Sequence, residues 1–195
     1  MRFKIVVVVL GIATLAGCSP VSGTPSPTTT TSTGPSAPKV TNPIDTTKYQ
    51  ADPCGLLTAA QVAPYTVTTP GSVVDGTSAL GPGCSWGNTN TGTTFIVQFI
   101  TANKVGLTAL YINKDIILKG GGYFEPTTVQ GYPAVFNSQA DQRKDGTCSL
   151  AIGIADSLDY NVAVAMADFS PKYNDPCGMA TQIADMAMTT LRGGS

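Results

Sequence analysis

The alternation of apolar and polar positions is clearest late in the chain, where two apolar runs follow each other closely. CSLAIGIAD occupies residues 148–156 and YNVAVAMAD occupies residues 160–168. Two β-prone runs joined by a tight turn predict a β-hairpin, with the segment SLD between them as the turn. Shorter runs of the same kind predict strands around 84–87, at 93–100, and on both sides of a turn at Gly131 within 127–137.

Helical spacing replaces this alternation in three other segments. Apolar residues recur every three or four positions between Pro176 and Leu191, which predicts an amphipathic helix. The same spacing predicts a helix at 108–118, followed by three glycines that end it. A short helix is predicted at 58–65, because Thr58 and Gln61 have the spacing of a capping box. Together these elements predict an α+β fold, an antiparallel sheet with helices packed on it.

The N-terminus has the pattern of an export signal. Arg2 and Lys4 precede the apolar run IVVVVLGIATLA, which has the length of a signal-peptide core and is too short to span a bilayer comfortably. The run ends in Leu15-Ala16-Gly17-Cys18, which resembles a bacterial lipobox. We therefore predict a lipoprotein signal peptide at 1–17, cleavage before Cys18, and lipid attachment to Cys18 as the membrane anchor. An ordinary signal peptide with an unmodified cysteine is the alternative.

Residues 18–50 differ in composition from the rest of the chain. In the 32 residues from 19 to 50, 20 are Ser, Thr or Pro. Such a segment has too little apolar surface to offset the entropy of ordering, so we predict a disordered, semi-stiff tether. The apolar runs that follow the signal peptide all lie in residues 51–195, which are enough for a single globular α+β domain.

Charge and composition exclude several kinds of function. Only 12% of the residues are charged and the net charge is -1, whereas a nucleic-acid-binding protein needs a basic face. The chain has no histidine, which excludes histidine-based catalytic triads, Cys–His dyads and imidazole metal sites. We therefore expect no nucleic-acid partner, no cofactor and no bound metal. After residue 50, seven basic residues stand against eleven acidic ones, so the domain itself carries about -4.

Four cysteines remain in the predicted exported domain: Cys54, Cys84, Cys148 and Cys177. Exported cysteines in even number usually form disulfides. No two of them are closer than 29 residues, so the close spacing of redox and zinc motifs is missing. We predict the local pairs Cys54–Cys84 and Cys148–Cys177, each worth ~3–4 kcal/mol in the chain-entropy model. Pairing Cys54 with Cys177 and Cys84 with Cys148 is the alternative.

Two of these cysteines belong to a repeated tetrapeptide, DPCG, at 52–55 and at 175–178. In each copy the aspartate stands where a side chain accepts hydrogen bonds from the free amides of a helix start. The proline fits the first helical position, where no amide hydrogen bond is lost. We therefore predict that each copy begins a helical turn, which its cysteine fastens to the sheet.

Few other residues suggest chemistry, and we predict no catalytic residue. Trp86 would suit sugar stacking if exposed, but its position beside Cys84 favours a place in the core. Glu125 would need a partner carboxylate to act as a glycosidase, and the spacing selects none. Glycines 120–122 lack the order of a phosphate-binding loop, and residues 141–146 lack the closing glutamate of a calcium loop, so both are predicted turns.

The same features taken together resemble a known family. After the lipobox and the tether come Asp52-Pro53-Cys54, Cys84-Ser85-Trp86, Cys148 and Asp175-Pro176-Cys177. This pattern is similar to that of a domain-of-unknown-function family of actinobacterial lipoproteins, the mycobacterial LprB/LprC-like proteins. The resemblance implies an exported, membrane-anchored protein of unknown activity. By analogy with related exported lipoproteins, it also implies a sandwich of sheet and helices like that of the PsbP and Mog1 proteins.

From these observations we expect a non-catalytic domain that binds an envelope ligand or a protein partner on the extracytoplasmic face of the cell membrane. One alternative is an envelope hydrolase or transferase that uses carboxylates alone. Another is an accessory subunit of a transport or cell-wall complex. Two carboxylates in one polar cleft would favour the enzyme, a cavity would favour ligand binding, and a flat exposed apolar patch would favour the accessory role.

Overall fold

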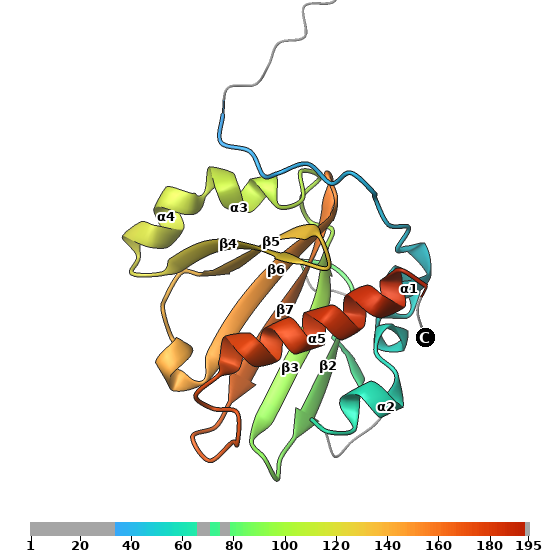
Figure 1. The fold of residues 1–195 in the computed structure, drawn as a ribbon, viewed down its shortest axis with the longest axis vertical. Helices are drawn as coiled ribbons and strands as arrows, with labels where there is room; N and C mark the ends of the chain where they lie inside the picture. Colours follow the sequence, from blue (N-terminus) through green and yellow to red (C-terminus); the bar gives the residue numbers. More distant parts are fainter. Residues whose placement is uncertain (1–33, 66–70, 75–78, 194–195) are drawn as a thin grey trace, which may run out of the picture. The chain divides into compact units, whose positions relative to one another are not determined.

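Seven antiparallel strands form one sheet in the computed structural model, which describes residues 34–65, 71–74 and 79–193. Their order across the sheet is β1-β2-β3-β7-β6-β5-β4 (Figure 1). Cys18, the predicted signal peptide and residues 19–33 of the predicted tether lie outside the described residues. The strands are β1 (Ser72–Val74), β2 (Gly83–Asn88), β3 (Thr93–Ile100), β4 (Tyr123–Val129), β5 (Tyr132–Ser138), β6 (Thr147–Ala155) and β7 (Leu158–Met166).

The predicted hairpin is confirmed and lies near the middle of the sheet, where β7 pairs with β6 on one side and β3 on the other. Its turn is shorter than predicted. Leu158 and Asp159 already belong to β7, which leaves only residues 156–157 as the turn. The register shifts between Gly153 and Ala155, so a β-bulge lies beside the turn.

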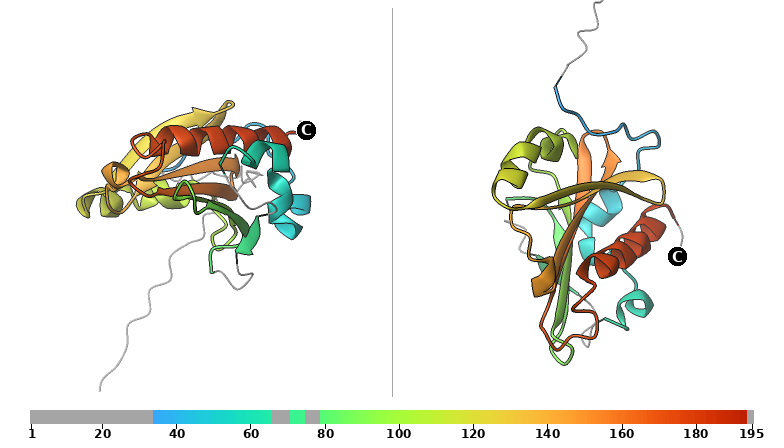
Figure 2. Two further views of the ribbon diagram at one scale, coloured as in Figure 1. Left: turned by 90° about the horizontal axis from the view of Figure 1, so that it is seen from below. Right: turned by 60° about the vertical axis from the view of Figure 1, so that its left-hand side comes forward.

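Helix α5 (Pro176–Leu191) covers one face of the sheet (Figures 1 and 2). Met179, Ile183 and Met188 are buried on its inner side, as the predicted three- and four-residue spacing requires. They share one core with the strand residues that point to this face, among them Leu150 and Val162. Since a fully buried aliphatic side chain contributes ~1.5–3 kcal/mol, this contact is the main source of stability in the domain.

Helices α3 (Thr108–Ile112) and α4 (Lys114–Lys119) lie on the opposite face of the sheet. Ile117, Phe124 and Val135 form a smaller core that joins α4 to β4 and β5. Over β3, β6 and β7 the same face carries half-buried polar residues, such as Gln98, Ser149 and Asn161, in place of a second apolar layer. The two faces are therefore unequal, and the α5 face carries the larger apolar core.

The helix predicted at 108–118 is two helices that meet at Asn113. The Asn113 side chain donates a hydrogen bond of 2.8 Å to the Ala109 carbonyl, one turn earlier. The Asn113 backbone amide donates to the same carbonyl at 3.2 Å, so the side chain shares this acceptor with the helical ladder at the point where the two helices meet. The end of the second helix before Gly120 agrees with the predicted role of the three glycines.

The described residues before β1 form three short helices, α1 (Thr47–Ala51), η1 (Pro53–Leu56) and α2 (Ala59–Val62). The predicted capping box is present in α2. The Thr58 hydroxyl accepts from the Gln61 amide, and the Gln61 side chain accepts from the Thr58 amide. Across the part of the chain that the structure describes, no helix is both long and apolar enough to cross a membrane.

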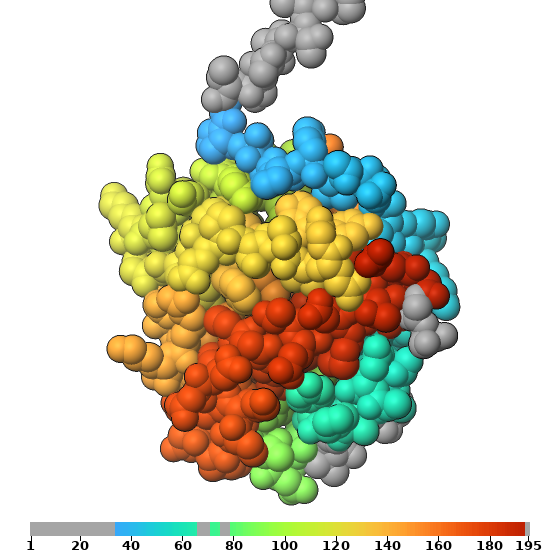
Figure 3. Space-filling view, in the orientation of Figure 1, coloured from blue at the N-terminus to red at the C-terminus, as the bar shows by residue number. Residues whose placement is uncertain are grey.

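The folded domain begins earlier than predicted. Residues 34–50 were expected in the tether, but they run along the domain surface (Figure 3). The Ile44 amide donates a hydrogen bond of 3.0 Å to the Ile154 carbonyl, and the Tyr132 hydroxyl donates one of 2.8 Å to the Asn42 carbonyl. The tether boundary at residue 50 is therefore wrong. Composition failed here because backbone carbonyls and amides make these contacts, and a polar sequence supplies them as well as an apolar one.

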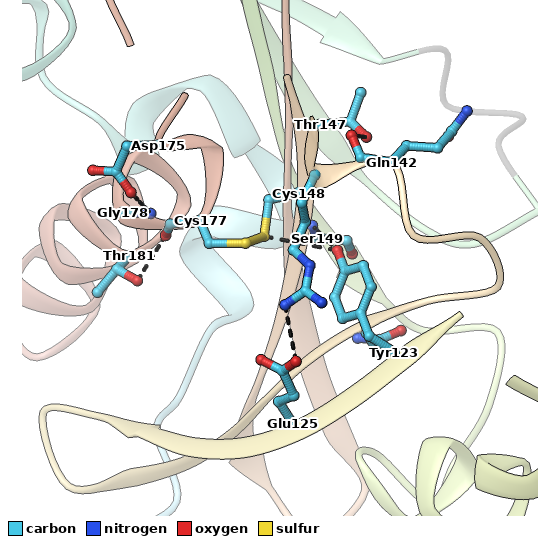
Figure 4. Close-up of a disulfide and its surroundings, with 12 residues drawn as sticks. Tyr123, Glu125, Gln142, Thr147, Cys148, Ser149, Asp175, Cys177, Gly178 and Thr181 are labelled. Atoms are coloured by element: carbon cyan, nitrogen blue, oxygen red, sulfur yellow. Dashed lines mark hydrogen bonds and ion pairs between the residues drawn. A yellow bond between two sulfur atoms is a disulfide. The ribbon is translucent and has the colours of Figure 1, made fainter. Parts of the chain in front are cut away.

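Both predicted disulfides are present. Cys54–Cys84 joins η1 to β2, and Cys148–Cys177 joins β6 to the start of α5 (Figure 4). Each one therefore ties a helical turn to a strand of the sheet, as expected. The alternative connectivity, with Cys54 bonded to Cys177, is wrong.

The repeated tetrapeptide has the predicted capping role in both places. Asp52 accepts a hydrogen bond of 3.3 Å from the Gly55 amide, and Asp175 accepts one of 3.0 Å from the Gly178 amide. The prolines occupy the first turn of each helix. The structure also explains the glycine, because a Cβ atom at Gly55 would lie 2.7 Å from the capping carboxylate. All four letters of DPCG therefore have a structural role.

Candidate functional site

The incompletely covered face of the sheet holds a cleft of about 200 Å³ between α3 and the central strands. Residues from β3, β5, β6, β7, α3 and the loop before α3 line it. Its polar residues are Asn103, Asn137, Ser149, Asp159 and Asn161, and its apolar residues include Leu80, Ile100 and Leu110. We call this site the Asp159 cleft.

Strand register explains why Asp159 faces this cleft. It lies opposite Gly153 of β6, and Asn161 follows two residues later on the same face of β7. Gly153 contributes no side chain there, and Leu107, from the residues just before α3, packs against this position instead. The loop before α3 runs close to the start of β7, and a Cβ atom at Gly106 would lie 2.9 Å from the Leu158 nitrogen. As a result, only 4% of Asp159 is exposed.

The Asp159 carboxylate is buried without compensation. Within the described residues, its Oδ1 atom has no hydrogen-bond partner. Burial raises the pKa of Asp159 to about 7, and its own backbone amide opposes this only in part. A buried charge is costly unless a counter-charge or hydrogen-bond donors accompany it. The fold therefore holds a strong acceptor inside the cleft and supplies no partner for it.

The neighbouring amides are fixed by hydrogen bonds of their own. The Ser149 hydroxyl donates a hydrogen bond of 2.9 Å to Asn161 Oδ1, which leaves the Asn161 Nδ2 group as a donor. The Asn137 Nδ2 group donates one of 3.2 Å to the Val135 carbonyl, which leaves Asn137 Oδ1 as an acceptor. The cleft thus presents one carboxylate together with a preset donor and a preset acceptor.

This arrangement is suited to binding more than to known carboxylate catalysis. Asp159 is the only carboxylate that lines the cleft, whereas a glycosidase needs a pair of them. In the parts of the chain that the structure describes, no three Asp, Glu or Cys residues cluster in a way that could hold a metal ion. What the cleft offers is a small polar pocket that can orient one molecule through hydrogen bonds.

A second group of polar residues surrounds the Cys148–Cys177 disulfide, on the α5 face (Figure 4). The Arg143 guanidinium lies over the Tyr123 ring, 4.3 Å from its centroid, in cation–π geometry. It also donates hydrogen bonds of 2.8 Å to Glu125 and 2.6 Å to Asp141. Glu125, the predicted candidate carboxylate, is therefore paired with a cation.

Of the two carboxylates that pair with Arg143, Glu125 and Asp141, the second is unsuited to act as a catalytic acid. The two carboxylates share Arg143, and its hydrogen bonds lower the pKa of Asp141 to about 2. A general acid needs the opposite shift. A larger hollow of about 390 Å³ lies beside this group, lined by Arg143, Lys144 and residues 174–177, but its arginine is already paired. The Asp159 cleft is the better candidate because the Oδ1 atom of its carboxylate has no hydrogen-bond partner among the residues that the structure describes.

With this geometry in view, the comparison with protein families gives one match. The model of DUF3558, described as a protein of unknown function, matches residues 13–190. This chain belongs to the DUF3558 family. The match includes both disulfides and the whole Asp159 cleft. No curated protein and no solved structure matched the chain, so the likeness to PsbP and Mog1 stays a prediction.

The remaining candidates have structural roles in this DUF3558 domain. Trp86 is 2% exposed and stacks on Phe95 with ring centroids 5.2 Å apart. It lies in the core beside the first disulfide, as predicted, and offers no surface for a sugar. Residues 141–146 include the short helix η2 (Arg143–Asp145) and end at Gly146, whose positive φ of 74° suits the predicted turn.

Asp159 is the functional candidate that sequence reasoning missed. The pattern placed it in the hairpin turn, where an aspartate is common and has no special meaning. A weak signal existed, because an alternating strand begins at the next residue and Asp159 continues the phase of Asn161. Its burial depends on the loop before α3, which the local pattern around residue 159 does not contain.

Proposed function

We propose that this DUF3558 protein is a lipid-anchored domain on the extracytoplasmic face of an actinobacterial cell membrane, and that it binds an envelope ligand in the Asp159 cleft without catalysing a reaction. The observation that carries the binding proposal is the unpaired, buried carboxylate of Asp159 in a preformed cleft. Ligand sites are typically concave and hold a few well-placed polar groups between apolar walls, as this one does.

The location rests on the N-terminal sequence. LAGC follows an apolar segment of signal-peptide length, and one lipidated cysteine carries enough acyl chain for stable anchoring at ~0.8 kcal/mol per buried methylene. Two disulfides in one small domain agree with an oxidising compartment. Replacing Cys18 with serine should abolish labelling by radioactive palmitate and release the protein from the membrane fraction. Retention of the variant in that fraction would contradict the proposed anchor.

The ligand-binding role can be tested by filling the cleft. Ala109 lines the cleft from α3 and is half-buried, so Ala109→Phe should occupy the space. Ala165 lies on the same sheet face but is exposed and outside the cleft, which makes Ala165→Phe a matched control. Native mass spectrometry of protein purified in mild detergent should show a bound small molecule on the wild type and on the control only. Equal adducts on all three proteins would exclude the cleft as the site.

An accessory role is the second candidate, and one specific observation favours it. Ile112 and Ile116, on α3 and α4, are 58% and 66% exposed and lie on neighbouring helices. Exposed apolar residues in a group are typical of protein contacts. Crosslinking in intact cells from position 116 should capture a specific envelope protein if this role is correct. A photo-crosslinker at exposed Thr189 on α5 serves as the comparison, and equal capture from both positions would count against it.

A further inference from the structure

We infer that the Asp159 cleft binds a primary alkylammonium group, supplied either by a free amine or by a lysine side chain. This inference rests on the proposed binding function and names the chemical class of the ligand. It follows from three features of the cleft, namely its charge, its hydrogen-bonding groups and its apolar rim.

The charge of the cleft favours a cation. Asp159 is almost completely buried, and its Oδ1 atom has no partner among the described residues. An ammonium group would supply both the missing counter-charge and the missing hydrogen-bond donor, because it carries three N–H donors and no acceptor. The whole domain from residue 34 is mildly acidic, with nine basic against twelve acidic residues, so its long-range field also attracts cations.

The protein itself has few cationic side chains that could pair with Asp159 in place of a ligand. Strands β3 and β6 contain no charged residue, and β7 contains only Asp159. Tyr111 of α3 stays neutral, because burial raises its pKa. Lys104, in the loop before α3, is the one cation near the cleft in sequence, and it is exposed and forms no ion pair with a described residue. Asp156, at the adjacent turn, is held by Lys39 at 2.9 Å.

The remaining groups suit an alkyl chain that ends in an ammonium. Asn137 Oδ1 is a further acceptor in the same cleft, since the amide nitrogen of Asn137 is already used. Leu80 lines the cleft and is 50% exposed, and Val105 beside the cleft loop is 45% exposed, so the rim is apolar. A volume of about 200 Å³ holds about seven waters at ~30 Å³ each, which is room for a short alkyl chain but not for a large cofactor.

Binding of a cation should depend on the ionisation of Asp159. The pKa of the empty site is about 7, so nearly all of the carboxylate is charged at pH 8 and only about a tenth at pH 6. The apparent dissociation constant rises as the binding-competent fraction falls. Affinity for an ammonium should therefore weaken about tenfold from pH 8 to pH 6, whereas a neutral ligand should show no such change.

Isothermal titration calorimetry of the full-length protein in detergent tests this directly. The probes are n-butylammonium chloride and its neutral analogue n-butanol, measured at pH 8 and pH 6. The variants are Asp159→Asn, which keeps the shape and removes the charge, and Asp168→Asn, which removes a charge from an exposed position outside the cleft. We expect the wild type and Asp168→Asn to bind butylammonium more tightly than butanol, with the pH dependence above. Asp159→Asn should bind it at least about tenfold more weakly, with no pH dependence.

Equal affinity for butanol, or unchanged binding by Asp159→Asn, would overturn the inference, and so would displacement of the amine by millimolar Ca²⁺.

A second pair of probes separates the two sources of the ammonium. If Nα-acetyl-lysine methylamide binds more tightly than butylammonium and its norleucine analogue does not bind, the ligand is a lysine of a peptide or protein. Equal binding of the two amines would assign it to a free amine.

The outcomes also separate this inference from the proposed function. If no amine binds but native mass spectrometry shows a neutral or anionic molecule that Ala109→Phe removes, the cleft is a binding site and only the ammonium assignment is wrong. If neither an amine nor any adduct sensitive to Ala109→Phe is found, both proposals are wrong.

Discussion

Replacing Asp159 with asparagine should stabilise the folded protein at alkaline pH, although the residue is buried. The substitution keeps the size and planarity of the side chain and removes its charge. In the wild type the carboxyl has a pKa of about 7 in the folded state against 3.8 for an unperturbed aspartate, because burial penalises the charged form. The folded state therefore holds the proton more tightly than the unfolded state does, and folding is opposed wherever this proton must be lost.

The direction of the pH dependence follows from proton linkage. Below pH 3.8 the carboxyl is neutral in both states and costs nothing. Between pH 3.8 and 7 the unfolded chain ionises while the folded one does not, so stability falls as pH rises, by up to ~1.4 kcal/mol per unit. Above pH 7 both states are ionised and the penalty is constant. Ionisation of Asp159 therefore lowers the free energy of unfolding by about 2 kcal/mol at pH 5 and by about 4 kcal/mol at pH 8.

Part of the stability gained by removing the charge is lost again in the Asp159→Asn variant. Asparagine still places a polar group in the cleft without a partner, which costs about 1–3 kcal/mol. We therefore expect Asp159→Asn to be more stable than the wild type by about 1–3 kcal/mol at pH 8 and nearly equal to it at pH 5. For a domain of this size, 1 kcal/mol corresponds to a shift in Tm of ~2–4 °C.

Urea denaturation at pH 5 and pH 8, followed by Trp86 fluorescence, measures the difference. The decisive quantity is the change in the free energy of unfolding between the two pH values. Asp168→Asn is the control, because that aspartate is exposed and its variant should keep the wild-type pH dependence. If Asp159→Asn has the same pH dependence as the wild type, Asp159 is not a desolvated carboxyl. A loss of stability in Asp159→Asn at pH 8 would mean that an internal hydrogen bond holds the charged form, and the argument for an empty acceptor would fail.

Three further changes test the fold of the domain. Replacing both Cys148 and Cys177 with alanine should lower the free energy of unfolding by about 3–4 kcal/mol, because the unfolded chain is no longer restrained by the 29-residue loop. A loss of less than ~1 kcal/mol in chemical denaturation would contradict this. Asp175→Ala should cost about 1 kcal/mol through loss of the α5 cap, measured by thermal unfolding, while Asp168→Ala should stay within ~0.5 kcal/mol of the wild type. Gly106→Ala should lower the free energy of unfolding by about 2 kcal/mol, since the residue has φ 50° and its Cβ would press on the backbone of β7. If the variant has the wild-type Tm, the loop has room to move and this reasoning is wrong.

Local features of the sequence were enough to predict most of the elements. Strands β3, β6 and β7 and helix α5 follow from periodicity over eight to sixteen residues. The capping box at Thr58 and both DPCG caps follow from groups three residues apart, whose geometry any helix start reproduces. The disulfides are the predicted local pairs, which close shorter loops than the alternative pairing would. One error was local in origin. The pattern did not show the break at Asn113, because an asparagine inside a helix is decided by the side-chain bond that it finds.

Residue identity and short-range spacing were enough to establish the α+β class and the helix caps, and they also led us to predict export and a lipid anchor. The three-dimensional packing was needed to show that residues 34–50 belong to the domain and that Asp159 is a buried carboxylate whose Oδ1 has no partner among the described residues. Both depend on contacts between segments distant in the chain: the strand at Ile154 that receives the Ile44 amide, and the loop at Gly106 that closes over β7. An aspartate in a turn and an aspartate in a cleft have the same local sequence, and their difference lies in the surface that the rest of the chain packs around them.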